Sequence, residues 1–151
     1  MSGRGLLKLN LGCGRDIRQG WINLDKIQYP GVDIVFDLDT FPYPFCDNTF
    51  DAILMQDVLE HLRDPITVMR EIYRISKDGC IIIIRTPHPK SPLMTQDKTH
   101  ISKIEPKFFT NFNVFPAEVL YYHCHVGKLF GILPVKRYWN QLAIIRVIKD
   151  E

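Results

Sequence analysis

Four short groups of residues in this sequence could form one ligand site. Gly12-Cys13-Gly14 is a glycine turn, in which the backbone can bend tightly and approach a ligand closely. Asp25 offers a carboxylate that can accept hydrogen bonds from both hydroxyls of a ribose. Asp37-Leu38 offers a carboxylate for an exocyclic adenine amine and an apolar side chain to cover the ring. The fourth group is Gln56-Asp57, which leads into Val58-Leu59-Glu60-His61.

Each of these groups follows a candidate β-strand. Short apolar runs occupy residues 6–11, 21–24, 32–36 and 50–55. In an open α/β sheet, ligands bind beyond the carboxyl ends of the strands, so the four groups are predicted to meet at one edge. A glycine turn or an aspartate at the end of a strand is usually structural when it stands alone. Their order and placement together favour a shared site.

The rest of the chain predicts one layered α/β domain over residues 1–151. A helix is expected over Pro65–Ser76, because its apolar residues have helical spacing and Asp64-Pro65 is a typical helix start. Cys80–Ile84 is apolar on both faces, as a buried parallel strand requires. Residues 85–103 are expected to form a loop, and residues 142–148 a final strand. A further helix could occupy Pro106–Phe112 or Pro116–His123.

The composition is that of an ordinary globular protein. The 151 residues are 46% hydrophobic and 24% charged, with a formal net charge of +2, which gives no electrostatic argument for nucleic acid or an anionic membrane. The four cysteines lack zinc-finger or C-x-x-C spacing, so we expect reduced thiols. No apolar stretch approaches the roughly 20 residues that cross a bilayer. With no signal peptide in evidence, we expect a cytoplasmic protein.

The triplet His123-Cys124-His125 could suggest a metal ion. A structural zinc site needs a second pair of ligands, and the sequence does not place one at suitable spacing. We therefore predict no metal site and expect a partly exposed strand or helix end at the triplet.

The motifs resemble those of the class I S-adenosylmethionine-dependent methyltransferases with compact domains. The resemblance is good over residues 6–88 and specific in three segments, residues 9–14, 41–51 and 58–62. It implies a Rossmann-like three-layer sandwich with a mostly parallel central sheet and an antiparallel C-terminal strand. It also implies S-adenosylmethionine as cofactor, bound by Asn10, Gly12, Cys13, Gly14, Asp25, Lys26, Asp37, Leu38, Gln56 and His61.

Two features depart from the family pattern. Asn10 stands where many members carry an acid, which weakens direct charge pairing with the methionyl ammonium. In addition, only ten residues separate Gly14 from Asp25, and a full crossover helix does not fit there together with a strand. The first helix is therefore predicted to be a single turn or absent, which would leave the cofactor more exposed on that side.

The family reaction transfers a methyl group from a sulfonium to a nucleophile, so the protein mainly supplies proximity and alignment. If the acceptor is a hydroxyl, a base can remove its proton, and His88 and His100 are the candidates. Methyltransferases that act on nucleobase amines carry an Asn/Asp-Pro-Pro-aromatic motif after the fourth strand, where this chain has Gln56-Asp57-Val58-Leu59. A small-molecule, sugar or lipid-linked acceptor is therefore favoured.

Two other functions remain open from the sequence. A non-catalytic partner subunit with the same fold would explain the short link after Gly14 and the presence of Asn10. A nicotinamide enzyme would need a third glycine three residues after Gly14, and Ile17 stands there instead. The acceptor, the oligomeric state and the need for a partner cannot be predicted from the sequence.

Overall fold

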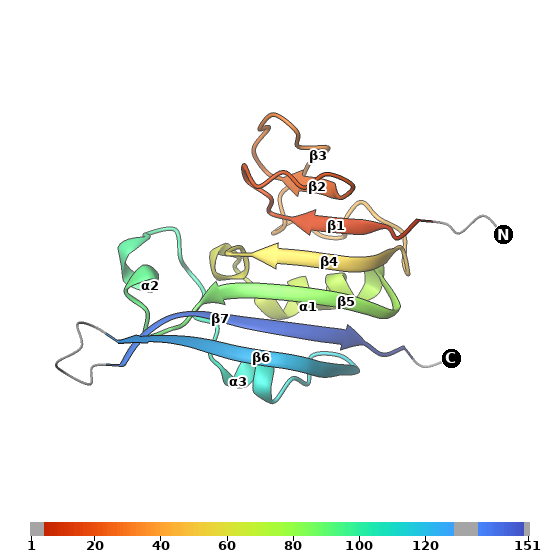
Figure 1. Ribbon diagram of the computed structural model, residues 1–151. Helices are drawn as coiled ribbons and strands as arrows, with labels where there is room; N and C mark the ends of the chain where they lie inside the picture. The colour runs from red at the N-terminus through yellow and green to blue at the C-terminus, as the bar shows by residue number, and fades with distance from the viewer. Residues whose placement is uncertain (1–4, 129–135, 150–151) are drawn as a thin grey trace.

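The computed structural model describes residues 5–128 and 136–149. Within these residues, seven strands form one sheet in the order β3-β2-β1-β4-β5-β7-β6 (Figure 1). The strands are β1 Lys8–Leu11, β2 Ile22–Asp25, β3 Ile34–Val35, β4 Phe50–Gln56, β5 Ser76–Pro87, β6 Ala117–Lys128 and β7 Lys136–Val147. The helical elements are η1 Leu59–His61, α1 Pro65–Ile75, α2 Pro92–Gln96 and α3 Lys107–Thr110.

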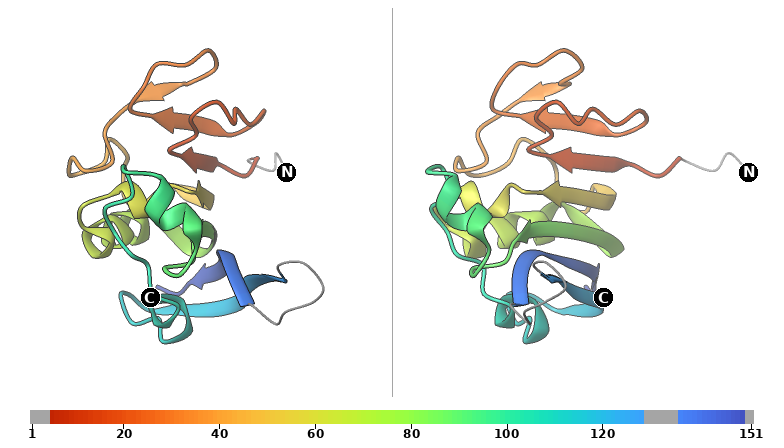
Figure 2. Two further views of the ribbon diagram at one scale, coloured as in Figure 1. Left: turned by 90° about the vertical axis from the view of Figure 1, so that its left-hand side faces the viewer. Right: turned by 60° about the vertical axis from the view of Figure 1, so that its left-hand side comes forward.

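The five strands from β3 to β5 are parallel, whereas β7 is antiparallel to both β5 and β6. This arrangement confirms the Rossmann-like α/β class, with a mostly parallel sheet and an antiparallel C-terminal part. Leu11, at the end of β1, is in register with Leu24 and Met55 of the neighbouring strands. The carboxyl ends of β1, β2 and β4 therefore share one edge of the sheet, as the sequence predicted. The left view of Figure 2 looks onto this edge, where η1 and α2 also lie.

The helix α1 begins where the sequence predicted. The Asp64 carboxylate accepts hydrogen bonds from the backbone N–H groups of Ile66 and Thr67, which otherwise lack partners inside the helix. The apolar face of α1 is buried in the same core as the centre of the sheet. Burying each such side chain stabilises the fold by about 1.5–3 kcal/mol relative to leaving it exposed. The buried residues of α1 are Val68, Met69, Ile72 and Ile75.

The link from β1 to β2, residues 12–21, contains turns and no helix. This confirms the prediction that the first helix is reduced to a turn or missing. Of the described residues, no helix is long and apolar enough to cross a membrane.

Three expectations for the second half of the chain need correction. The helix α1 ends at Ile75, and the strand β5 starts at Ser76 and not at the predicted Cys80. Residues 85–103 are not all loop, because β5 continues to Pro87 and α2 begins behind Ser91, whose hydroxyl accepts a hydrogen bond from the Leu93 N–H.

The second candidate helix, Pro116–His123, is instead part of β6, while α3 lies within the first candidate, Pro106–Phe112. Strand β6 is stabilised by pairing with β7, and two register shifts interrupt the alternation that would reveal a strand in the sequence. His123-Cys124-His125 lies in this strand, and both of its histidines are exposed.

Candidate functional site

The glycine turn after β1 has a backbone conformation that favours glycine. Gly12 and Gly14 have φ angles of +63° and +52°, in the region that glycine adopts without strain. A Cβ atom added to Gly12 would lie 2.5 Å from Val58 Cγ2, whereas one added to Gly14 would meet no atom within 4 Å. The turn therefore packs against Val58, the residue before η1, on one side and exposes the Gly14 backbone to open space on the other.

Between these glycines, Cys13 is buried, and its N–H donates to the carbonyl of Leu24 over 2.9 Å. Burial, together with the nearby carboxylate of Asp25, raises the pKa of Cys13 to about 11. The thiol therefore stays protonated at neutral pH and does not act as a nucleophile. Cys13 contributes to the site by fixing the turn onto β2.

A buried pair of amides fixes the loop that follows. Asn10 Nδ2 donates to the carbonyl of Asp16 over 2.8 Å and to Asn23 Oδ1 over 3.1 Å. Asn23 Oδ1 also accepts from the Arg18 N–H, and Asn23 Nδ2 donates to the Arg18 carbonyl. Because both amides are almost fully buried and point into this network, Asn10 shapes the loop in place of a helix. The sequence places Asn10 at the cofactor, and an asparagine there can also form local hydrogen bonds, as it does in the structure.

The acid after β2 is joined to the glycine turn. Asp25 Oδ2 accepts from the Gly14 N–H over 2.7 Å, and Asp25 Oδ1 accepts from the Ile27 N–H over 2.9 Å. A carboxylate has about four acceptor positions, so it can still accept from a ligand. Lys26, beside it, is exposed at the same edge of the sheet.

The group after β3 is divided between surface and core. Asp37 is exposed, and its Oδ1 accepts from the Asp39 N–H over 3.0 Å. Leu38 is only 5% exposed, and its carbonyl accepts from the hydroxyl of Tyr43. Asp37 is thus available to a ligand, while Leu38 contributes mainly to the hydrophobic core.

The end of β4 is held by two arginines. Arg18 reaches across from the first loop and donates to Gln56 Oε1 over 2.9 Å. Asp57 has a φ angle of +52°, and its carboxylate pairs with the guanidinium of Arg85. Its N–H also donates to the Arg85 carbonyl. These contacts turn the chain sharply from β4 into η1.

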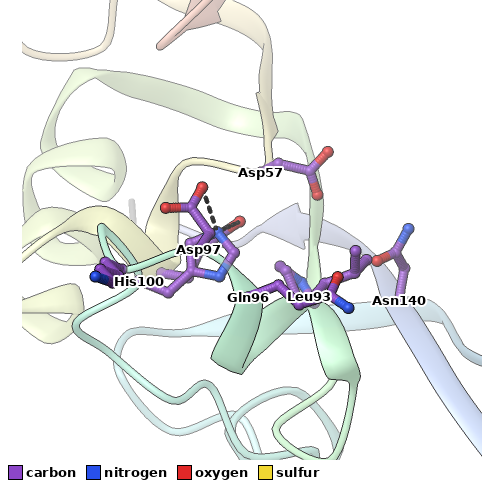
Figure 3. Close-up of a pocket in the computed structure, with 9 residues that line it drawn as sticks. Asp57, Leu93, Gln96, Asp97, His100 and Asn140 are labelled. Carbon is purple, nitrogen blue, oxygen red and sulfur yellow. Dashed lines mark ion pairs between the residues drawn. The ribbon is translucent and has the colours of Figure 1, made fainter.

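A cavity of about 420 Å³ opens beside this turn, between η1, the end of β5, α2 and β7 (Figure 3). Its size is in the range of small-molecule sites, which are usually clefts with a few placed polar groups. The residues that line it are Asp57, Glu60, Pro87, Leu93, Gln96, Asp97, Lys98, His100 and Asn140.

The polar centre of the cavity is Glu60, which is fully buried. One of its oxygens, Oε2, accepts from the Thr86 hydroxyl over 2.9 Å, while Oε1 has no hydrogen-bond partner. Burial raises the pKa of Glu60 to about 7, and the hydrogen bonds and His100 act in the opposite direction. The carboxyl is therefore held in a strongly desolvated position next to the cavity.

Two histidines lie next to Glu60. His100 Nε2 is 3.9 Å from Glu60 Oε1 and 3.6 Å from Asp97 Oδ2, the ion pairs drawn in Figure 3. The His61 ring packs edge-on against His100, with 4.6 Å between ring centroids, and its Nδ1 lies 3.1 Å from the Thr99 carbonyl. His61 thus lies beside the cavity-lining His100.

His88 has a different environment. It is only 6% exposed, its Nδ1 accepts from the Lys90 N–H over 3.1 Å, and burial lowers its pKa. It follows Pro87 at the rim of the cavity, but it is not among the residues that line the cavity. Of the two histidines predicted to face an acceptor, only His100 lines the cavity.

Comparison with known families identifies the chain. Residues 6–84, just over half of it, match the family described as "Methyltransferase domain". The chain belongs to this methyltransferase family.

The methyltransferase domain has relatives of known sequence and structure. It is 31% identical over 81 residues to the ubiquinone/menaquinone biosynthesis C-methyltransferase UbiE of Desulfotalea psychrophila, a match that covers 52% of this chain. The chain spans only 33% of the length of that relative.

Two solved structures share the fold. A SAM-dependent methyltransferase from Archaeoglobus fulgidus superposes with a TM-score of 0.67 at 17% identity, covering 94% of this chain and 86% of the other. A methyltransferase from Haloferax volcanii, solved in complex with its activator, superposes with a TM-score of 0.66 at 14% identity, covering 97% and 84%. At these identities the likeness concerns the fold.

The residues of this methyltransferase domain fit the family's cofactor, S-adenosylmethionine. The open space beside Gly14 lets a ligand approach the backbone, and Asp25 and Asp37 stand at the ends of adjacent parallel strands. The pattern of residues did not predict that Asn140, from the antiparallel part of the sheet, would line the cavity. Only the three-dimensional fold brings it there.

Proposed function

We propose that this chain is an S-adenosylmethionine-dependent methyltransferase that acts on a small-molecule acceptor. The observation that carries the proposal is the hydrogen bond from Gly14 N–H to Asp25 Oδ2. It ties the glycine turn to the acid of the next strand, in the part of the chain that matches the methyltransferase family.

S-adenosylmethionine, when bound, supplies a methyl group that is already activated by its sulfonium. The chain's own residues then need to bind and align. Asp25 accepts from the ribose hydroxyls, and Asp37 accepts from the adenine amine. Gly12 and Gly14 keep the backbone close to the ligand, and Gln56 and His61 lie at the turn that leads from the cofactor side to the cavity.

The acceptor binds in the cavity beside η1. Leu93 and Pro87 offer it apolar contacts, while Gln96, His100 and Asn140 offer polar ones. His100 is the acceptor-side histidine in this proposal. A quinone-type ring suits such a mixed lining, and it is the first acceptor to test because the relative from Desulfotalea psychrophila is named for ubiquinone and menaquinone biosynthesis.

The first experiment is a thermal shift of the purified protein with S-adenosylmethionine, S-adenosylhomocysteine, NAD and ATP in parallel. A ligand at a hundredfold its Kd stabilises the native state by about 2.7 kcal/mol, which raises the Tm of a domain this size by several degrees. We expect a shift with the two sulfur ligands only. A shift with NAD alone would overturn the proposal in favour of a nicotinamide enzyme.

A partner-dependent or non-catalytic role is the second candidate. It is favoured by the missing first helix and by the structure of the Haloferax volcanii methyltransferase, which was solved with an activator. The two candidates differ in turnover. Slow transfer of labelled methyl groups to a panel of phenols and quinones by the isolated chain supports the enzyme, whereas cofactor binding with no transfer to any acceptor supports the partner-dependent role.

A further inference from the structure

Three potential metal ligands lie close together beside the cavity, and two of them, Glu60 and His100, line it. One carboxylate oxygen of Glu60 and one ring nitrogen each of His61 and His100 lie within 4.8 Å of one another. One carboxylate with two imidazoles is a ligand set used by catalytic zinc and by non-haem iron. The three residues come from two segments of the chain, η1 and the loop before α3, which are held together by backbone hydrogen bonds. Those bonds run from the N–H groups of Ile101 and Ser102 to the Glu60 carbonyl.

The distances suit an ion better than a direct hydrogen bond. Glu60 Oε1 and His100 Nε2 are 3.9 Å apart, which is too long for a hydrogen bond. Bonds of about 2.1 Å to a shared ion would place two ligand atoms of a tetrahedral site about 3.4 Å apart. Closing the Glu60–His100 pair from 3.9 Å to this separation takes a movement of a few tenths of an ångström in each side chain. The separations that involve His61 lie within 4.8 Å and close by a larger side-chain movement.

Two buried atoms in the cluster have no hydrogen-bond partner among the described residues. Glu60 Oε1 belongs to a fully buried carboxyl, and His100 Nδ1 belongs to a side chain that is 7% exposed. A buried polar atom without a hydrogen bond costs about 1–3 kcal/mol. A cation bound between Glu60 and His100 would remove this cost at Oε1.

The hydrogen bonds of Thr99 determine the proton position on His61. The Thr99 hydroxyl donates to Asp97 Oδ1 over 2.6 Å, so it can only accept from His61 Nδ1, which is 3.0 Å away. The Thr99 carbonyl, 3.1 Å from the same nitrogen, can also only accept. Nδ1 therefore carries the proton, and Nε2 keeps its lone pair for a ligand. Histidines that bind metals are held in this way, with the other ring nitrogen donating to a carbonyl.

We propose that Glu60, His61 and His100 bind a divalent transition-metal ion, with Zn²⁺ as the best match to the ligand set. Asp97 Oδ2, 3.6 Å from His100 Nε2, is close enough to add a second carboxylate, and the cavity leaves a position open toward a bound molecule. That open position would polarise an oxygen of the acceptor, a role that rests on the proposed function, whereas metal binding itself does not. The absence of zinc-finger spacing explains why the sequence predicted no metal here.

The direct test is a metal titration of the chelator-treated protein. Zn²⁺ binding is measured by calorimetry, and Co²⁺ binding by the visible bands of a tetrahedral site with nitrogen and oxygen ligands. We expect one ion per chain with either metal. No saturable binding, or binding of several weak ions without the visible bands, would overturn the proposal.

Matched variants locate the ion. Glu60→Gln, His61→Gln and His100→Gln each remove one ligand, and we expect each to weaken Zn²⁺ binding by about a hundredfold or more. Thr99→Val removes an outer hydrogen bond and should weaken binding by about tenfold. His123→Ala, on an exposed histidine of β6, is the control and should bind as the wild type does. Wild-type affinity in Glu60→Gln and His100→Gln, or a loss in His123→Ala, contradicts the assignment.

Two further measurements distinguish a loss of the metal site from a loss of folding and from a failure of the proposed function. Far-UV circular dichroism and thermal midpoints of the metal-free variants test whether each variant is folded. His61, which is only partly buried, carries the test if Glu60→Gln does not fold. Binding of S-adenosylhomocysteine to the metal-free protein reports on the proposed function alone. Metal binding without this cofactor binding would leave the metal site standing and remove the methyltransferase proposal.

Discussion

The backbone N–H of Gly14 donates to Asp25 Oδ2 over 2.7 Å, which joins the end of β1 to the end of β2 at the cofactor edge. In a domain without a first helix, this bond and the buried amides of Asn10 and Asn23 hold the loop that a helix would otherwise fix. The carboxylate thus stabilises the fold, and in the proposed function it also binds the ribose. The first prediction tests this double role.

Asp25→Asn should weaken binding of S-adenosylhomocysteine by about one to two orders of magnitude. Hydrogen bonds to a charged group contribute about 1.5–3 kcal/mol, and the neutral amide also places one donor where the ribose hydroxyls and the Gly14 N–H need acceptors. Calorimetric titration of the variant measures the change. Asp78→Asn, far from the glycine turn in sequence and on β5, is the control. Equal affinities in Asp25→Asn and wild type would rule out Asp25 as a ribose ligand.

Gly12→Ala should destabilise the domain more than Gly14→Ala. Both substitutions place alanine at positive φ, which costs about 1–2 kcal/mol. Only at Gly12 does the new methyl group also meet Val58, and such overpacking adds about 1–3 kcal/mol. Urea unfolding of both variants gives the difference. Gly14→Ala should remain folded but lose cofactor affinity, because the added methyl group would occupy open space that the proposed ligand needs. A larger loss of stability at Gly14 would contradict this account.

Asn10→Asp should not restore a family-like site. The new carboxylate would face the Asp16 carbonyl and Asn23 Oδ1, both acceptors, and would lose the two hydrogen bonds that Asn10 donates. The donors of Asn23 are already used by other acceptors, so its amide cannot turn to compensate. We expect a loss of about 2–4 kcal/mol in the free energy of unfolding at pH 7. Tighter cofactor binding with unchanged stability would show that the acid is tolerated here.

The contribution of Glu71 should depend on pH. Hydrogen bonds from Arg74, with a further one from the Tyr43 N–H, hold the pKa of Glu71 below its usual value. A group with a lowered folded pKa stabilises the fold above its unfolded pKa, about 4.3, and this contribution is lost as the pH falls through the folded pKa. Glu71→Gln should therefore cost about 1–2 kcal/mol at pH 7 and progressively less below pH 4.

Unfolding of wild type and Glu71→Gln across this pH range checks the prediction. Because Arg74 also donates to the carbonyls of Phe45 and Tyr43, its position is not set by Glu71 alone. A difference between the two proteins that stays constant with pH would mean that the carboxylate charge contributes nothing.

The sequence predicts the cofactor half of the molecule well because its signals there are local. The apolar runs of β1, β2 and β3 stop at Gly12, Asp25 and Asp37, and Asp64-Pro65 fixes the start of α1 within the residues that form it. The count of residues between Gly14 and Asp25 was sufficient to exclude a full first helix. These predictions needed no knowledge of distant contacts.

The secondary structure and the site contacts of the second half are less predictable because they depend on residues that are distant in the sequence. Strand β6 pairs with β7, and the two register shifts between them interrupt the alternation of side chains between the two faces of the sheet. In the site, Glu60 and His61 were visible at a helix start, but their contact with His100 depends on a loop about 40 residues further on. Such tertiary contacts override local preference and leave no pattern at a fixed spacing.

The position of β7 has a consequence for synthesis of the chain. β7 follows β6 in the sequence but lies between β5 and β6 in the sheet (Figure 1). On the ribosome, where chains emerge from the N-terminus, β5 and β6 are therefore complete before the strand that joins them exists. Until β7 appears, one edge of β5 is open and β6 has no partner strand in the sheet. Open edges pair readily with other chains. Translation that stops before Lys136 would leave β5 and β6 without the strand that joins them, so a truncated product should aggregate even though the parallel cofactor half is already made.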